Sequence, residues 1–127
     1  MSALEMRPEI RARWVTALRS GDYPQTRTRL HDDDGFCCLG VLCDLARRDG
    51  IIQAVLNDVE GDWEYAGEAF ELPPAVREWA GLRAAGSADP TVSVIVDDER
   101  MDMDLASLND DYDFSFDQIA DAIEGAS

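Results

Sequence analysis

The stretch FCCLGVLCDLA, from Phe36 to Ala46, is an apolar run that holds all three cysteines of the chain. It follows the acidic turn Asp32–Gly35 and leads into Arg47 and Arg48. Its apolar residues recur at helical spacing, which predicts a helix over residues 37–48. The flanking charges support this helix, because carboxylates before the N-terminus and arginines in the last turn both complement the helix dipole. The stretch therefore forms either the middle of a core or the edge of a site.

Weaker signals place further elements around this helix. Hydrophobic periodicity and capping residues predict helices over residues 8–19, from Leu72-Pro73-Pro74 to about residue 82, and over 116–124. β-Branched residues predict strands over 26–31 and 91–96, whereas 51–58 is ambiguous between helix and strand and 63–70 between strand and loop. We expect an acidic surface loop over 97–104 and a short apolar piece over 105–109. The predicted fold is α+β, with three to four helices packed on a small antiparallel sheet in a single compact domain, residues 1–127.

The charge of the chain restricts its partners. It has 27 acidic and 11 basic residues, all of the latter arginine, and its net charge is −16. Such a charge argues against binding nucleic acid through phosphates and against binding anionic membranes. It is compatible with solubility alone, with attraction to a basic protein, or with imitation of a nucleic acid.

The cellular location is predicted from what the sequence lacks. Residues 1–13 contain no apolar region typical of a signal peptide, and no run approaches the roughly 18 apolar residues of a membrane span. An odd number of cysteines favours reduced thiols. We therefore expect a protein of the bacterial cytoplasm. The sequence leaves its oligomeric state open.

A cysteine nucleophile is the sharpest enzymatic hypothesis. Cys37 or Cys38 at a helix N-terminus would have a lowered thiol pKa, and His31, the only histidine, would have to act as the base. The alternative, which we favour, is that these cysteines are small apolar core residues.

Metal sites fit the sequence poorly. Cys37, Cys38, Cys43 and His31 could supply four zinc ligands, but no Cys-x-x-Cys pair is present. The pattern Asn109-x-Asp111-x-Asp113 begins like a calcium loop, but its sixth and twelfth positions are Phe114 and Ala120. We expect no metal and no other cofactor.

Arg27 and Arg29 form a local basic patch. Their guanidinium groups could bind a phosphate or a carboxylate, which would suit a small-molecule or nucleotide-binding module. The interpretation we favour is that they pair with the carboxylates of Asp32, Asp33 and Asp34 across the following turn.

Three blocks of the sequence resemble a known family. Residues 14–23 (WVTALRSGDY), residues 35–44 (GFCCLGVLCD) and the C-terminal Leu108-Asn109-Asp110, Ser115-Phe116 and Ile119-Ala120-Asp121 are similar to small uncharacterised proteins of phages and prophages, many of them in actinobacteria. The resemblance implies a phage or prophage origin and an accessory protein that acts on a host component. It implies no activity and no catalytic residues.

Carboxylates near the C-terminus are the main candidate binding surface. A rigid array of them could imitate phosphates and compete for a basic cleft. Our leading expectation is therefore a non-enzymatic binding protein or inhibitor that docks on a basic host protein. The alternatives are a cysteine-dependent hydrolase or transferase and the module built on Arg27 and Arg29. The candidate acidic residues are Asp97, Asp98, Glu99, Asp102, Asp104, Asp110, Asp111 and Asp113.

Overall fold

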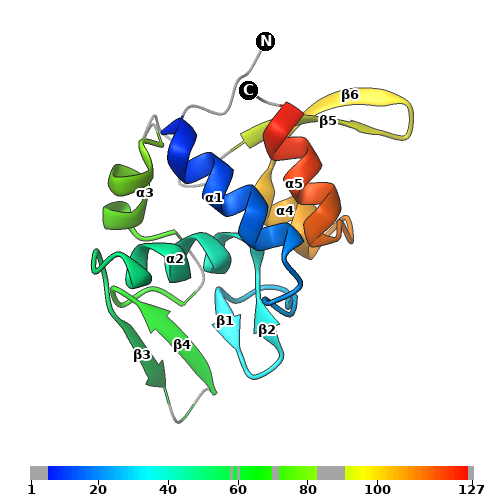
Figure 1. Cartoon of the computed structure of the whole chain (residues 1–127). Coiled ribbons are helices and arrows are strands. Elements are labelled where there is room, and N and C mark those ends of the chain that lie inside the picture. The colour runs from blue at the N-terminus through cyan, green and yellow to red at the C-terminus, as the bar shows by residue number, and fades with distance from the viewer. Residues whose placement is uncertain (1–5, 58, 60, 70–71, 83–90, 126–127) are drawn as a thin grey trace.

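A computed structural model describes residues 6–57, 59, 61–69, 72–82 and 91–125 of the chain. These ranges contain five helices, a four-stranded antiparallel sheet in the order β2-β1-β4-β3, and a separate β5–β6 hairpin (Figure 1). The α+β fold class is therefore confirmed, with one helix more than expected. The helices are α1 (Pro8–Arg19), α2 (Cys38–Arg48), α3 (Pro74–Ala80), α4 (Leu105–Asp110) and α5 (Phe116–Gly125). The strands are β1 (His31–Asp32), β2 (Gly35–Phe36), β3 (Ala54–Asn57), β4 (Asp62–Tyr65), β5 (Thr91–Val96) and β6 (Glu99–Asp104).

Helix α2 lies at the centre of the molecule. It packs against α1, α3, α4 and β2, and every residue from Cys38 to Ala46 is buried. The close packing depends on Gly40, because a Cβ atom at this position would lie 1.7 Å from the carbonyl oxygen of Leu30. The indole N–H of Trp14 in α1 donates a hydrogen bond of 2.9 Å to the Cys38 carbonyl. The FCCLGVLCDLA stretch thus forms the middle of the core.

The predicted strand over residues 26–31 is wrong, since only His31 at its end belongs to a strand. Thr28 has a left-handed backbone, with φ of 77°, which interrupts an extended chain. The loop is held from a distant part of the sequence. Thr28 N donates to Asp110 at 2.8 Å, and Asn109 Nδ2 donates to the Thr26 carbonyl at 2.9 Å. Tertiary contacts have overridden the strand preference of threonine.

The acidic loop predicted over residues 97–104 is also wrong, because β6 occupies most of it. β5 and β6 pair from Thr91↔Asp104 to Val96↔Glu99 around the two-residue turn Asp97-Asp98. Both turn residues have positive φ, 52° and 65°, as the tightest hairpins require. Such turns usually contain Gly or Asn, and neither is present here.

The remaining elements agree better with the sequence. The ambiguous segments contain β3 and β4, and the short apolar piece becomes α4, which the Asp104 side chain caps at Ser107 N. Ser115 and Gln118 form the expected capping box of α5, since each side chain accepts a hydrogen bond from the other's backbone N–H. None of the helices within the described ranges combines the length and apolar character needed to cross a membrane.

Candidate functional site

The three cysteines lie in the core. Cys37 is 5% exposed, whereas Cys38 and Cys43 are completely buried. The Cys37 sulfur caps α2 by accepting a hydrogen bond from Gly40 N at 3.4 Å. Burial raises the pKa of the Cys37 thiol to about 12 and raises the pKa values of Cys38 and Cys43 well above the usual range. The expectation of a lowered thiol pKa is wrong, and the core position that we favoured is confirmed.

His31 is surrounded by aromatic rings. Its Nδ1 lies 2.9 Å from the Tyr65 hydroxyl oxygen. Its ring stacks on Phe36, with centroids 3.8 Å apart, and on Trp63, with centroids 5.3 Å apart. Burial is the main cause that lowers the pKa of His31. These contacts do not position His31 as a base for a thiol.

The residues considered as metal ligands have other contacts. Within the ranges that the structure describes, no three His, Cys, Asp or Glu side chains are grouped so that they could hold a metal ion. Asn109 is completely buried, and its Oδ1 accepts hydrogen bonds from Gln25 Nε2 at 2.9 Å and Cys38 N at 3.3 Å. The Asn109 side-chain oxygen, which would be the first ligand of a calcium loop, therefore already accepts hydrogen bonds inside the protein.

Arg27 and Arg29 form ion pairs with carboxylates other than those expected. Arg27 pairs with Asp113 at 2.6 Å, and Arg29 pairs with Asp62 at 3.3 Å. The predicted pairing with Asp32, Asp33 and Asp34 is wrong, because the loop is turned at Thr28 toward α4. Since both guanidinium groups already have carboxylate partners, nothing in the geometry supports them as an anion site.

The acidic candidates gather on one part of the molecule. We call β5, β6, α4 and α5 the acidic unit, because α5 packs on β5 and α4, and α4 follows β6 directly in the chain. Residues 97–124 within this unit contain eleven acidic residues and one arginine, a net charge of −10 out of −16 for the whole chain. The hairpin lies at the opposite end of the molecule from β3 and β4 (Figure 1).

Some of the eight candidate carboxylates also contact other groups of the described chain. Asp104 caps α4, Asp110 accepts the hydrogen bond from Thr28 N, and Asp113 pairs with Arg27. The candidate residues that are exposed to solvent are Asp97, Asp98, Glu99, Asp102, Asp111 and Asp113. The hairpin turn thus presents carboxylates outward, while those near α4 also stabilise the loop before β1.

A second polar centre surrounds Asp44 on α2. Although Asp44 is only 4% exposed, both of its carboxylate oxygens are hydrogen-bonded. Oδ2 accepts from the Tyr23 hydroxyl at 2.6 Å and from Arg48 Nε at 3.1 Å, and Oδ1 accepts from Arg47 Nε at 2.8 Å. The carboxylate is therefore fixed between two arginines and a phenol.

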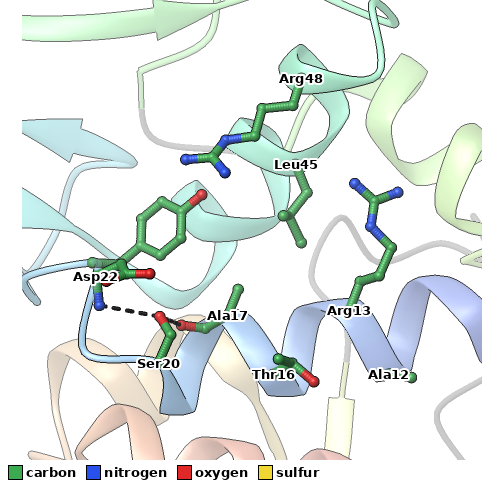
Figure 2. Close-up of a pocket in the computed structure, with 9 residues that line it drawn as sticks. Ala12, Arg13, Thr16, Ala17, Ser20, Asp22, Leu45 and Arg48 are labelled. Carbon is green, nitrogen blue, oxygen red and sulfur yellow. Dashed lines mark hydrogen bonds between the residues drawn. The ribbon is translucent and has the colours of Figure 1, made fainter.

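A pocket of about 420 Å³ opens beside this centre. We call it the Asp44 pocket, and its walls include Tyr23, His31, Phe36, Trp63, Arg47 and Arg48. A neighbouring hollow of about 450 Å³ shares Asp22, Tyr23 and Arg48 with it. Figure 2 shows Arg13 from α1 and Arg48 from α2 on two sides of this hollow, with Leu45 between them.

A protein family described as a domain of unknown function, DUF8296, matches residues 6–127. The chain belongs to the DUF8296 family. No curated protein and no solved structure matches this DUF8296 chain.

The Asp44 pocket of this DUF8296 protein is not evident from its sequence. One signal was present, because Asp44 is a single carboxylate within the apolar run and is followed by arginines at the helical spacings i+3 and i+4. That spacing predicts ion pairs on one helix face. It does not reveal that Tyr23, His31 and Trp63 meet the same face.

Proposed function

We propose that this protein is a non-enzymatic binding protein, of phage or prophage origin, that docks its acidic unit on a basic surface of a host protein. The observation that carries the proposal is the concentration of eleven carboxylates with one arginine in residues 97–124. A field of one sign attracts an oppositely charged surface and speeds the encounter. The buried thiols offer no comparable support for the enzymatic alternative.

The hairpin is the best placed part of the acidic unit for contact with a partner. Asp97, Asp98 and Glu99 are exposed at its turn, and their side chains make no hydrogen bond or ion pair with the rest of the described chain. Three adjacent exposed carboxylates form a small cluster of negative charge, as the phosphates of a nucleic acid do. This cluster supports imitation of nucleic acid as the specific form of the proposal.

The test compares partner capture by the wild-type chain and by a triple variant, Asp97→Asn, Asp98→Asn and Glu99→Gln. Asparagine tolerates the left-handed backbone at the turn, so the hairpin should persist. Each protein is immobilised and exposed to bacterial host lysate, and bound proteins are eluted with salt or with duplex DNA. We expect the wild type to capture a basic, nucleic-acid-binding protein that both eluents release, and the triple variant to lose most of it.

A matched control removes the same charge from another part of the surface. Asp33→Asn, Asp34→Asn and Glu78→Gln change three exposed acidic residues outside the acidic unit. This control should capture the partner as well as the wild type does. Equal capture by the wild type and the hairpin variant, or no salt-sensitive partner at all, would contradict the proposal.

A further inference from the structure

At Asp44, two positively charged side chains share one carboxylate, unlike at the other ion pairs that the structure describes. Two arginines, Arg47 and Arg48, share this single buried carboxylate. Together they leave one positive charge that Asp44 does not balance, in a chain of net charge −16. One further carboxylate, that of the exposed Asp22, lines the same pocket. The other ion pairs give each arginine at least one carboxylate of its own, as in Arg7–Glu9, Arg13–Asp49, Arg19–Asp121, Arg27–Asp113 and Arg29–Asp62.

The geometry of these two arginines leaves donors available. Arg48 bonds Asp44 through Nε, and its guanidinium carbon lies 5.7 Å from the centre of the Tyr23 ring. Arg47 bonds Asp44 through Nε and one terminal nitrogen, each at 2.8 Å. The other terminal nitrogens, two on Arg48 and one on Arg47, make no hydrogen bond to any residue that the structure describes. Asp44 therefore orients two guanidinium groups whose remaining N–H groups can bind an anion.

The same pocket has an aromatic wall. Phe36, His31 and Trp63 form a continuous stack, in which His31 is the middle ring. Trp63 has one face against His31, so this stack does not cover its other face. Tryptophan and phenylalanine rings stack readily on the flat faces of nucleobases. Burial lowers the pKa of His31, which favours the neutral form of this ring.

We propose that the Asp44 pocket binds a small ligand of the nucleoside monophosphate class, with its base against the aromatic wall and its phosphate at Arg47 and Arg48. A phosphate, with three terminal oxygens and up to two charges, matches two guanidinium groups better than one carboxylate does. Asp22, exposed at the rim, can accept hydrogen bonds from the N–H groups of a base. The pocket volume of about 420 Å³ lies within the usual range for small-molecule sites.

This proposal does not depend on the proposed function. The pocket is built from α2, β1, β2, β3, β4 and the segment after α1, whereas the acidic hairpin is formed by β5 and β6. A protein that loses its partner when the hairpin is neutralised could still bind a nucleotide. Separate variants therefore test the two proposals.

The experiment titrates the full chain with AMP, GMP, CMP and UMP at constant ionic strength, by calorimetry and by tryptophan fluorescence. We expect saturable one-to-one binding of at least one nucleotide. Its nucleoside alone and inorganic phosphate alone should each bind at least about tenfold more weakly, because each occupies only half of the site. Equal binding of phosphate and nucleotide would identify an adventitious ion only and would overturn the proposal.

Two variants test the two halves of the pocket. Arg48→Gln removes one guanidinium but leaves Asp44 paired with Arg47 and Tyr23, and it should weaken nucleotide binding about 10- to 100-fold. Trp63→Leu should weaken it at least about fivefold through lost stacking. Arg100→Gln, which makes the same charge change on β6, is the control and should bind like the wild type. Circular dichroism confirms that each variant is folded.

The proposal fails on either of two results. One is that none of the four nucleotides gives saturable binding at millimolar concentration. The other is that folded Arg48→Gln and Trp63→Leu variants both bind a nucleotide as tightly as the wild type does.

Discussion

At the scale of single residues, Asp44 shows how a charge can persist inside this core. A buried carboxylate is costly unless it is fully hydrogen-bonded and paired. Asp44 meets this condition through Tyr23, Arg47 and Arg48. Because the arginines come from the same helix one turn later, their positions are set locally, whereas Tyr23 must be brought in by the segment after α1.

The Tyr23 contact predicts a change of stability at alkaline pH. Burial, followed by the hydrogen bond to Asp44, raises the pKa of Tyr23 to about 12, above the unfolded value of about 10. A raised pKa in the folded state contributes stability that is fully present below pH 10 and is lost as the pH rises through 12. We therefore expect the free energy of unfolding of the wild type to fall between pH 10 and pH 12, and Tyr23→Phe to reduce this fall.

Urea denaturation followed by circular dichroism at several pH values measures this effect. The pKa of the Cys37 thiol, also raised to about 12, adds to the decline in both proteins, so the comparison isolates Tyr23. Tyr112→Phe, at an exposed position, is the control and should follow the wild type. Identical slopes for Tyr23→Phe and the wild type would show that the Tyr23 contact does not contribute.

At the scale of elements, α4 is short but connects distant parts of the chain. Asn109 on α4 is completely buried and bonds Gln25, the Thr26 carbonyl and Cys38 N. It thereby fixes the loop after α1 and the N-terminus of α2 at the same time. The left-handed turn at Thr28 depends on the neighbouring Asp110 in the same way.

The contacts of Asn109 predict a large loss of stability on substitution. Asn109→Ala leaves the Thr26 carbonyl and Cys38 N without this partner, and each buried unpaired group costs about 1–3 kcal/mol. We expect the free energy of unfolding to fall by at least about 2 kcal/mol. Asn109→Asp should also destabilise, since it keeps the acceptor for Cys38 N but replaces the donor to Thr26 with a second oxygen.

Chemical denaturation of these variants and of Asp111→Ala tests the prediction. Asp111 is the exposed residue that follows the last residue of α4. Its substitution should change the free energy of unfolding by less than about 0.5 kcal/mol. If Asn109→Ala were as stable as Asp111→Ala, the network around Asn109 would not hold the loop.

At the scale of the whole molecule, charge is distributed unevenly. The acidic unit carries most of the net charge, while the Asp44 pocket at α2 holds two arginines on one carboxylate. Close carboxylates in the acidic unit repel one another and oppose folding. Several exposed ion pairs stabilise the folded state, but each contributes only about 0–1 kcal/mol to the free energy of unfolding.

This imbalance predicts that salt stabilises the protein. Raising the ionic strength from about 0.01 M to about 0.1 M shortens the screening length from about 30 Å to about 10 Å, which weakens repulsion across the surface. The melting temperature should therefore rise with sodium chloride in a thermal scan. The triple variant at Asp97, Asp98 and Glu99 should show a smaller rise, and a fall in the wild type would mean that ion pairs outweigh repulsion.

Helices and caps could be predicted from the sequence because their signals are local. The apolar spacing in residues 37–48 predicted α2 to within one residue, and Ser115 with Gln118 predicted the start of α5. The net charge and its acidic cluster were also evident from composition. None of these features requires knowledge of which distant segments meet.

The remaining features were decided by tertiary contacts. The loop at residues 26–30 failed to form a strand because Asn109 and Asp110 hold it, and β6 formed because it could pair with β5. The Asp44 pocket likewise exists only where α2, β1 and β4 come together. Sequence alone determined where α1, α2, α3 and α5 form and how charge is distributed along the chain. The tertiary structure decided which polar groups are buried together, because pairing across long sequence separations leaves no local pattern.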